Sequence, residues 1–259
     1  MDKSIKLVIF AHARSGSSSL YRLLQLHPSL HIAEEPFHDS YQAWNPDEKN
    51  YVDHITDIAS LEEQLGVLFA KYNGIKILQY QLPAELYTHL LRKPEVRIVF
   101  LRRRNLLQAA VSGRIAEQTK VWKIWDLAGD ITQTYQQLAP LSIPSLREVI
   151  EYDDKSMTLY EQIVDRRPPG SYVKLWYEDL YMPDVAHNRS VLQRAFDLLK
   201  LSMPATPEVD YLLDPVLTKL NPAKLYKFIP NATEIDEQLG SGKTGWLFEK
   251  PPQVSSLSG

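Results

Sequence analysis

The chain has 259 residues, of which 44% are hydrophobic and 24% are charged, and its formal net charge is -3. A charge balance so close to neutral excludes nucleic-acid binding through a broadly basic surface, so any anion site has to come from a local cluster of side chains. Cysteine is absent. Its absence excludes disulfides and thiolate metal sites and is typical of a reducing compartment.

Apolar, β-branched runs of strand length alternate along the chain with segments of helical periodicity. The expected strands are Ile5–Ala11, Leu30–Ala33, Ile75–Tyr80, Val96–Leu101 and Ser171–Trp176. The expected helices are Ser19–Leu26, Ser60–Tyr72, Pro83–Leu91, one beginning near Asn105, Leu146–Asp165 and Arg189–Leu199. The alternation predicts an α/β fold, a single P-loop-like domain over 1–259 with a central parallel β-sheet flanked by helices on both faces. The proline-rich chain from about 203 to 259 is expected to be an irregular tail.

Other parts of the chain carry more local expectations. Ser60 is expected to be the N-cap of its helix, with Glu63 in the capping-box position. The polar and aromatic segment Asp39–Asp57 predicts a loop or lid. No run approaches the roughly 20 apolar residues that cross a bilayer, and the first strand begins near Ile5. We therefore expect no signal peptide or membrane span, and a cytoplasmic location.

The residues between the first strand and the first helix are suited to an anion. Gly16 permits a positive φ and a close approach of the backbone, and Arg14 adds a fixed charge. Ser17, Ser18 and Ser19 place hydroxyls and free N–H groups at a helix N-terminus. The Walker pattern G-x-x-x-x-G-K-[ST] is absent. The alternative interpretation is a simple capping turn.

A second basic motif, LRRRNLLQAAVSG, follows the strand Val96–Leu101. Arg104 and Ser112 are eight positions apart, so if a helix starts near Asn105 the serine lies about two turns into it. The long Arg104 side chain can then fold back toward the same ligand. By strand alternation Arg102 shares a face with Arg104, whereas Arg103 points away. The alternative is an exposed basic strand end.

These two motifs together resemble the phosphate-binding motifs of sulfotransferases that use 3′-phosphoadenosine 5′-phosphosulfate (PAPS). The resemblance implies that Arg14 contacts the 5′-phosphate and the departing bridge oxygen, and that Arg104 and Ser112 bind the 3′-phosphate. The other loop residues implied at the 5′-phosphate are Ser15, Gly16, Ser17, Ser18 and Ser19. The late segment LGSGKTGWLF resembles the basic loop that closes over the nucleotide, which implies contacts from Lys243, Gly245 and Trp246. A surface turn with its tryptophan docked on the core is the alternative.

The base of the transfer is expected near the second strand. In cytosolic members of the family the base is a histidine, and Gln81 stands in its place here. Carbohydrate and tyrosylprotein sulfotransferases use a glutamate instead, and Glu35, 21 residues after Arg14, occupies that position. Glu34 is the reserve candidate and points to the opposite side if the segment is extended. Both glutamates can alternatively be solvated loop charges. His38, just beyond, can touch substrate or lie at the surface.

The resemblance implies a PAPS-dependent sulfotransferase that moves the sulfuryl group to a hydroxyl of a carbohydrate, glycolipid or other small acceptor. The implied transfer is in-line and metal-independent, with Glu35 as the base and PAPS as co-substrate. A small-molecule or glycan acceptor is the expected partner; nucleic acid, a membrane span and a metal are not expected. The segments Asp39–Asp57 and Thr119–Tyr152 are expected to shape the acceptor cleft. Two alternatives stay open: a P-loop kinase of a small molecule, and a non-catalytic nucleotide-binding protein of the same fold.

Overall fold

The computed structural model describes residues 5–122, 131–218 and 223–248. Contacts divide the chain into two compact units, residues 1–103 with 153–218 (the first unit) and residues 104–152 with 219–259 (the second unit). None of the described helices is long and apolar enough to cross a membrane. That the whole chain acts as one domain stays a prediction.

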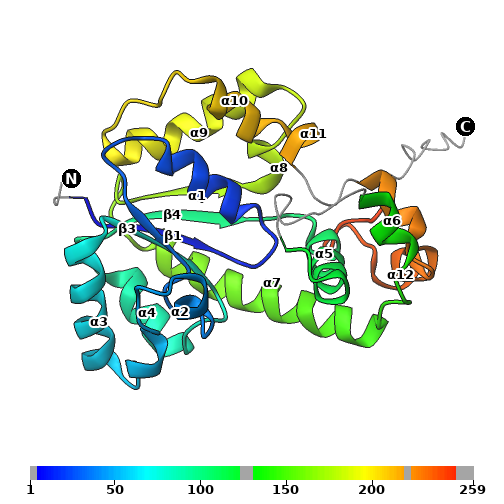
Figure 1. The fold of residues 1–259 in the computed structure, drawn as a ribbon, viewed down its shortest axis with the longest axis horizontal. Coiled ribbons are helices and arrows are strands. Elements are labelled where there is room, and N and C mark those ends of the chain that lie inside the picture. The colour runs from blue at the N-terminus through cyan, green and yellow to red at the C-terminus, as the bar shows by residue number, and fades with distance from the viewer. Residues whose placement is uncertain (1–4, 123–130, 219–222, 249–259) are drawn as a thin grey trace, which may run out of the picture. The chain divides into compact units, whose positions relative to one another are not determined.

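The first unit is built on a five-stranded parallel sheet with the strand order β2-β3-β1-β4-β5 (Figure 1). The strands are β1 (Leu7–Ala11), β2 (Ile32–Glu34), β3 (Gly74–Leu78), β4 (Arg97–Arg102) and β5 (Tyr172–Trp176). The last residue of central β1, Ala11, is in register with Leu78 on one side and Leu101 on the other. The loops after these three strands therefore leave the sheet at one edge, the carboxyl edge at which open parallel sheets bind ligands.

Helices cover both faces of this sheet (Figure 1). One face packs against α1 (Ser17–Gln25), α9 (Val185–Leu199) and α10 (Pro207–Leu213), and the other against α3 (Ile58–Lys71), α4 (Ala84–Arg92) and the later turns of α7 (Ile143–Asp165). Strand β1 supplies both cores, because its alternate residues point to opposite faces: Ile9 belongs to the first core and Phe10 to the second. The predicted α/β class, a central parallel sheet flanked by helices on both faces, is confirmed.

The segment expected to be a loop or lid is held in place by its own side chains. It contains two short helices, α2 (Tyr41–Trp44) and η1 (Val52–His54). Between them Glu48 accepts hydrogen bonds from the hydroxyls of Tyr51 at 2.8 Å and Tyr72 at 2.7 Å, and it pairs with Lys71. Burial opposes ionisation of Glu48, but these bonds outweigh it and hold the pKa of the carboxyl below its ordinary value. At neutral pH this charged cluster fastens the segment to the end of α3.

The expected capping of α3 is wrong by three residues. The helix begins at Ile58, and its N-cap is Asp57, whose carboxylate accepts a hydrogen bond from the Ser60 backbone N–H at 2.8 Å. The Ser60 hydroxyl in turn accepts the Asp57 N–H at 3.0 Å. Asp57 and Ser60 thus complete a reciprocal capping box, in which the serine is the third helical residue and Glu63 has no part.

The chain after Met203 is also more regular than expected. Its described residues form α10, α11 (Pro215–Thr218), η3 (Ala223–Phe228) and α12 (Ala232–Leu239). Pro207 and Pro215 open helices α10 and α11. Proline is favoured there because a first-turn residue has no intrahelical partner for its N–H. The prolines were therefore signals of helix starts, and the expectation of an irregular tail is wrong for these residues.

The second unit has a helical core of its own. It contains α5 (Leu106–Thr119), α6 (Ile131–Gln136), the first turns of α7, η3 and α12, packed around buried side chains such as Val111, Leu146 and Ile235. The prediction that a helix starts near Asn105 is confirmed, since the Asn105 side chain accepts a hydrogen bond from the Gln108 N–H at 2.9 Å.

Candidate active site

The loop between β1 and α1 holds its glycine in a backbone conformation that other residues rarely adopt. Gly16 is the N-cap residue of α1 and has a φ of 81°. A Cβ added to it would lie 2.8 Å from ring atoms of Tyr177 and Tyr181. Arg14 has a positive φ as well, 60°. The loop therefore turns tightly in front of the first turn of α1, which contains no acidic residue, and N–H groups at such a helix start are suited to an anion.

Gly16→Ala is expected to destabilise the protein by about 1–3 kcal/mol, because alanine has to adopt the positive φ and its methyl group meets two tyrosine rings. Gly66→Ala in α3 is the matched control. A Cβ there meets nothing within 4 Å, so this change is expected to stabilise by about 0.5–1 kcal/mol. Urea unfolding of both variants measures the difference; a Gly16→Ala protein as stable as the wild type would contradict the crowding described here.

Two serine hydroxyls of the loop bond to the protein itself. Ser15 is fully buried, and its hydroxyl donates to the His12 carbonyl at 2.7 Å. The Ser18 hydroxyl donates to Glu34 Oε1 at 2.9 Å. Any contact of Ser15 with an anion would therefore come from its backbone N–H. The phosphate contacts of residues 15–19 stay predictions.

A buried polar network supports the loop from below. His12 is fully buried, and its Nε2 accepts the Arg103 backbone N–H at 3.0 Å while its Nδ1 lies 3.6 Å from Asp153 Oδ2. Gln79 Nε2 donates to the other Asp153 oxygen at 2.6 Å. Since Nε2 accepts, the neutral imidazole carries its proton on Nδ1, toward the carboxylate. This network joins the ends of β1, β3 and β4 to α7, and the sequence reading missed it.

The three consecutive arginines have different surroundings. Arg102 pairs with Glu161 at 2.5 Å on α7. Arg103 is buried; its guanidinium donates to the Arg14 carbonyl at 3.1 Å and lies 4.3 Å from the centroid of the Tyr177 ring. Arg104 is exposed and belongs to the second unit. Arg103 points away from the partners of Arg102, as expected, and is the arginine that supports the turn at Arg14. Strand β4 ends at Arg102, and that Arg104 shares the face of Arg102 stays a prediction.

Glu35 lies at the carboxyl edge of the sheet with its carboxylate held by two side chains. Lys76 Nζ pairs with Glu35 Oε1, and Gln81 Nε2 donates to Glu35 Oε2 at 2.8 Å. The Lys76 side chain is only 1% exposed and that of Glu35 only 12%. The Glu35 backbone N–H also donates to the Lys76 carbonyl at 2.7 Å. The carboxylate is thus fixed on both oxygens, and it is not a solvated loop charge.

The expectation that Glu34 and Glu35 point to opposite sides is wrong. Glu34 Oε1 lies 3.6 Å from the same Lys76 Nζ, and the Ser18 hydroxyl, 3.3 Å from that nitrogen, bonds to Glu34 as well. The reason is the backbone of Glu35, whose φ of 58° ends the extended conformation directly after β2. Both glutamates and the serine loop therefore meet at one buried ammonium group.

Lys76 is a site residue that the sequence reading missed. It lies in β3, inside the apolar run GIKIL, where all five residues are buried. A lysine at a fully buried strand position requires an acidic partner, because an unpaired buried charge costs several kcal/mol. A lysine inside an apolar strand was therefore the signal in the sequence that could have indicated a buried ion pair. Its partner, Glu35, lies 41 positions earlier in the chain.

Gln81, which stands where a histidine base was sought, is a rigid support. Its side-chain oxygen accepts the Leu78 N–H at 3.0 Å, so its amide nitrogen is directed at Glu35. Its own N–H donates to the Tyr87 hydroxyl at 3.0 Å. These bonds hold Gln81 in place from both Leu78 and Tyr87. Gln81 in turn is one of the two side chains that orient the Glu35 carboxylate.

In the second unit, Arg104 directly precedes the N-cap residue of α5, and Ser112 lies within that helix. Ser112 is buried at 4% exposure. The turn at residues 241–246 packs against the start of the same helix: the Leu107 N–H donates to the Thr244 carbonyl at 2.9 Å, and Asn105 Nδ2 donates to the Trp246 carbonyl at 2.7 Å. Gly245 has a φ of 82° and lies so close to Asn105 that a Cβ would be 2.4 Å from its side chain. Lys243 is exposed in this turn.

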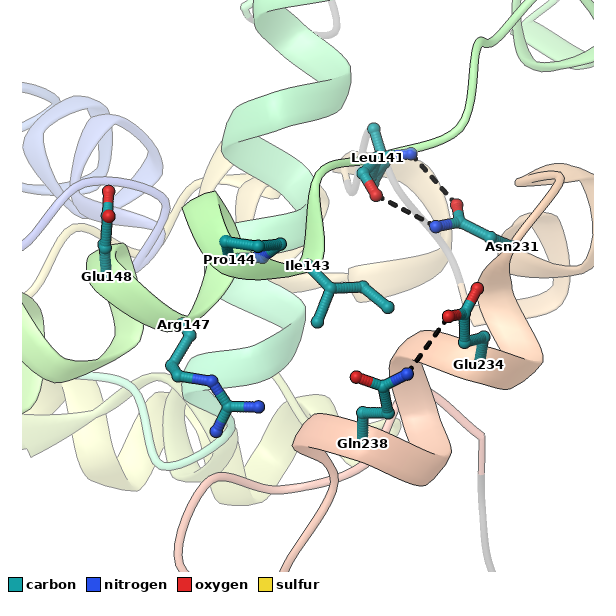
Figure 2. A pocket seen from close by; sticks show the side chains of 8 residues that line it. All are labelled: Leu141, Ile143, Pro144, Arg147, Glu148, Asn231, Glu234 and Gln238. Atoms are coloured by element: carbon teal, nitrogen blue, oxygen red, sulfur yellow. Dashed lines mark hydrogen bonds between the residues drawn. The ribbon is translucent and has the colours of Figure 1, made fainter.

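The second unit also contains an open pocket of about 540 Å³, shown in Figure 2. Its lining residues are Leu141, Ile143, Pro144, Arg147, Glu148, Asn231, Glu234 and Gln238. Asn231 closes one end through two 2.9 Å hydrogen bonds to the backbone of Leu141. None of the predicted site residues lines it. No group of three or more potential metal ligands occurs within the described residues.

Comparison with known proteins gives matches in structure alone. No protein-family model matches the chain, and no curated protein matches its sequence. A solved structure from Alicyclobacillus acidocaldarius is 15% identical with a TM-score of 0.46, over 90% of this chain and 94% of that one. A domain from the curacin biosynthetic pathway is 14% identical with a TM-score of 0.49, over 93% and 95%. Mouse SULT7A1 complexed with PAP is 12% identical with a TM-score of 0.40, over 94% and 70%.

All three are sulfotransferases. At these identities and TM-scores the likeness assigns no role to any residue of this chain, so the roles below rest on its own geometry.

Proposed function

We propose that the chain is a sulfotransferase that moves the sulfuryl group of PAPS to an acceptor hydroxyl, with Glu35 as the base. The observation that carries this proposal is the carboxylate of Glu35, fixed by Lys76 and Gln81 at the carboxyl edge of the sheet. The same lysine contacts Ser18 in the loop at the start of α1. A base and an anion-binding turn are therefore linked through one ammonium group.

The donor is proposed to bind through both of its phosphate groups. The 5′-phosphosulfate is assigned to Arg14 and to the N–H groups of residues 15–19, at the start of a helix whose first turn has no acidic side chain. The 3′-phosphate is assigned to Arg104 and Ser112. Support for grouping these with Lys243, Gly245 and Trp246 comes from the second unit, in which the 241–246 turn bonds to the start of α5.

The proposed reaction is an in-line transfer. Glu35 takes the proton of the acceptor hydroxyl while that oxygen forms a bond to sulfur. The bond between sulfur and the bridging oxygen breaks, its electron pair stays on that oxygen, and adenosine 3′,5′-bisphosphate (PAP) leaves. Arg14 and Lys76 supply positive charge where negative charge develops, so the proposed step needs no metal.

The acceptor is proposed to be a hydroxyl of a carbohydrate, glycolipid or other small compound. The glutamate position after β2 supports this class, since it is the position that carbohydrate-type members of the resembled family use. A chain without cysteine agrees with a cytoplasmic location, which we propose on that ground.

Calorimetric titration with PAP in the presence of a metal chelator tests the donor. We expect PAP to bind at least about tenfold more tightly than adenosine 5′-phosphate, because the 3′-phosphate adds charge-assisted hydrogen bonds. Arg104→Ala is expected to remove that difference. Arg114→Ala, on the helix α5 that follows Arg104, is the matched control and should keep it; Arg114 pairs with Glu117 at 2.7 Å. Equal affinity for the two nucleotides in the wild type, or binding that requires Mg²⁺, would contradict the proposal.

A further inference from the structure

Three aromatic side chains come together from the loops that follow the neighbouring strands β2 and β3, the same two loops that contain Glu35 and Gln81. The His38 and Trp44 rings have centroids 4.5 Å apart, and the His38 and Tyr80 centroids are 6.4 Å apart and nearly perpendicular. We name His38, Trp44 and Tyr80 the aromatic cluster. All three lie within the first unit.

Two of the three rings in the aromatic cluster are largely exposed, although large apolar rings are usually covered, and the His38 side chain is 23% exposed. Trp44 is 56% exposed and Tyr80 is 47% exposed. The backbone around Trp44 is ordered, since the buried Tyr41 begins the same short helix α2 and the Glu48 network fastens the segment. Exposed aromatic faces on a fixed backbone are typical of binding surfaces.

The cluster is joined to the proposed base on two sides. The His38 backbone N–H donates to the Glu35 carbonyl at 3.0 Å. Tyr80 directly precedes Gln81, whose amide holds the Glu35 carboxylate. The loops that carry His38 and Tyr80 are thus both bonded to Glu35, one through its backbone carbonyl and the other through its carboxylate.

His38 adds a polar contact to the apolar faces. Its Nδ1 accepts the Ser40 N–H at 3.0 Å, so the neutral ring carries its proton on Nε2, where it can donate to a ligand hydroxyl. Three carboxylates act on Tyr80, and one of them, Glu35, is paired with Lys76 on its other side. After burial, the influences that raise the pKa of the Tyr80 hydroxyl are the carboxylates of Glu35, Asp39 and Asp153. Such a field disfavours an anionic ligand and suits one that donates several hydroxyl hydrogen bonds.

Building on the proposed function, we propose that the aromatic cluster is the acceptor subsite and that its ligand is an uncharged pyranoside. The apolar C–H face of the sugar ring lies on Trp44 and Tyr80, and one ring hydroxyl reaches Glu35. Asp39, whose side chain is 93% exposed, accepts from a further hydroxyl.

Ligand-observed NMR titration tests this subsite without any turnover. The probes are the uncharged methyl glycopyranosides of glucose, galactose and mannose, with glucuronate as an anionic ring and 4-methylphenol as a flat ring without several hydroxyls. We expect at least one methyl glycopyranoside to bind the full chain more tightly than glucuronate or the phenol. Trp44→Ala and Tyr80→Ala are each expected to raise its Kd by about tenfold, while Trp44→Phe keeps it close to the wild-type value.

Tyr211→Ala is the matched control, because Tyr211 is 53% exposed but lies on α10, which packs on the opposite face of the sheet. It should leave the Kd unchanged. The proposal is overturned if no glycopyranoside binds, if glucuronate or the phenol binds as tightly, or if Trp44→Ala and Tyr80→Ala have no more effect than the control. Failure of PAP to bind, with sugar binding intact, would instead remove the proposed transfer and leave the sugar subsite.

Discussion

Glu35→Gln is expected to lower kcat by about a thousandfold while leaving the affinity for PAP unchanged. Glutamine keeps the size of the side chain but cannot take the proton of the acceptor hydroxyl. The phosphate contacts proposed for PAP come from other residues, so nucleotide binding has no reason to change. Steady-state assays with labelled PAPS and calorimetry with PAP measure the two quantities on the same protein.

Glu34→Gln is the matched control for this experiment, since both carboxylates meet the same lysine. It is expected to keep most of the activity, because Glu34 already accepts the Ser18 hydroxyl. If Glu34→Gln abolishes turnover and Glu35→Gln does not, the base is Glu34 and the assignment here is wrong.

Lys76→Met is expected to destabilise the protein by about 3–5 kcal/mol and to remove turnover. Methionine fits the space but leaves two partly buried carboxylates facing each other without the cation between them. Their repulsion also moves Glu35 from the position that Gln81 helps to define. Urea unfolding and the transfer assay report the two losses.

The double variant Lys76→Met with Glu35→Gln separates charge pairing from packing. Because it removes one of the two unpaired carboxylates, it is expected to be more stable than Lys76→Met alone, which is the signature of direct coupling. Equal stability of the single and double variants would mean that the lysine acts through packing of its aliphatic stem and not through its charge.

The sheet was predictable because its strands are short runs of mostly apolar residues, and the tight turn before α1 because glycine readily adopts the positive φ found there. Local backbone angles, in contrast, were not predictable from the sequence. Glu34 and Glu35 were placed on opposite sides by a rule for extended chain, and a single positive φ at Glu35 brings them together. Nothing in a single sequence announces a glutamate in that conformation.

Contacts between residues that are far apart in the chain were the second feature that the sequence did not predict. Lys76 meets Glu35 because β3 pairs with β2, and Arg103 bonds to the Arg14 carbonyl because β4 pairs with β1. His12 meets Asp153 across 141 positions of sequence. Short motifs report neighbours along the chain, whereas this support comes from neighbours across the sheet.

The positive φ of Arg14 means that the residue best for stability at this position differs from the one proposed to serve activity. An ordinary side chain loses about 1 kcal/mol in this conformation, whereas glycine adopts it without strain. Directed evolution for heat resistance alone would therefore tend to enrich glycine at position 14 and discard the charge proposed to act at the leaving oxygen. Persistence of arginine under such a regime, with catalysis left unselected, would mean that the side chain contributes more to folding than its backbone strain costs.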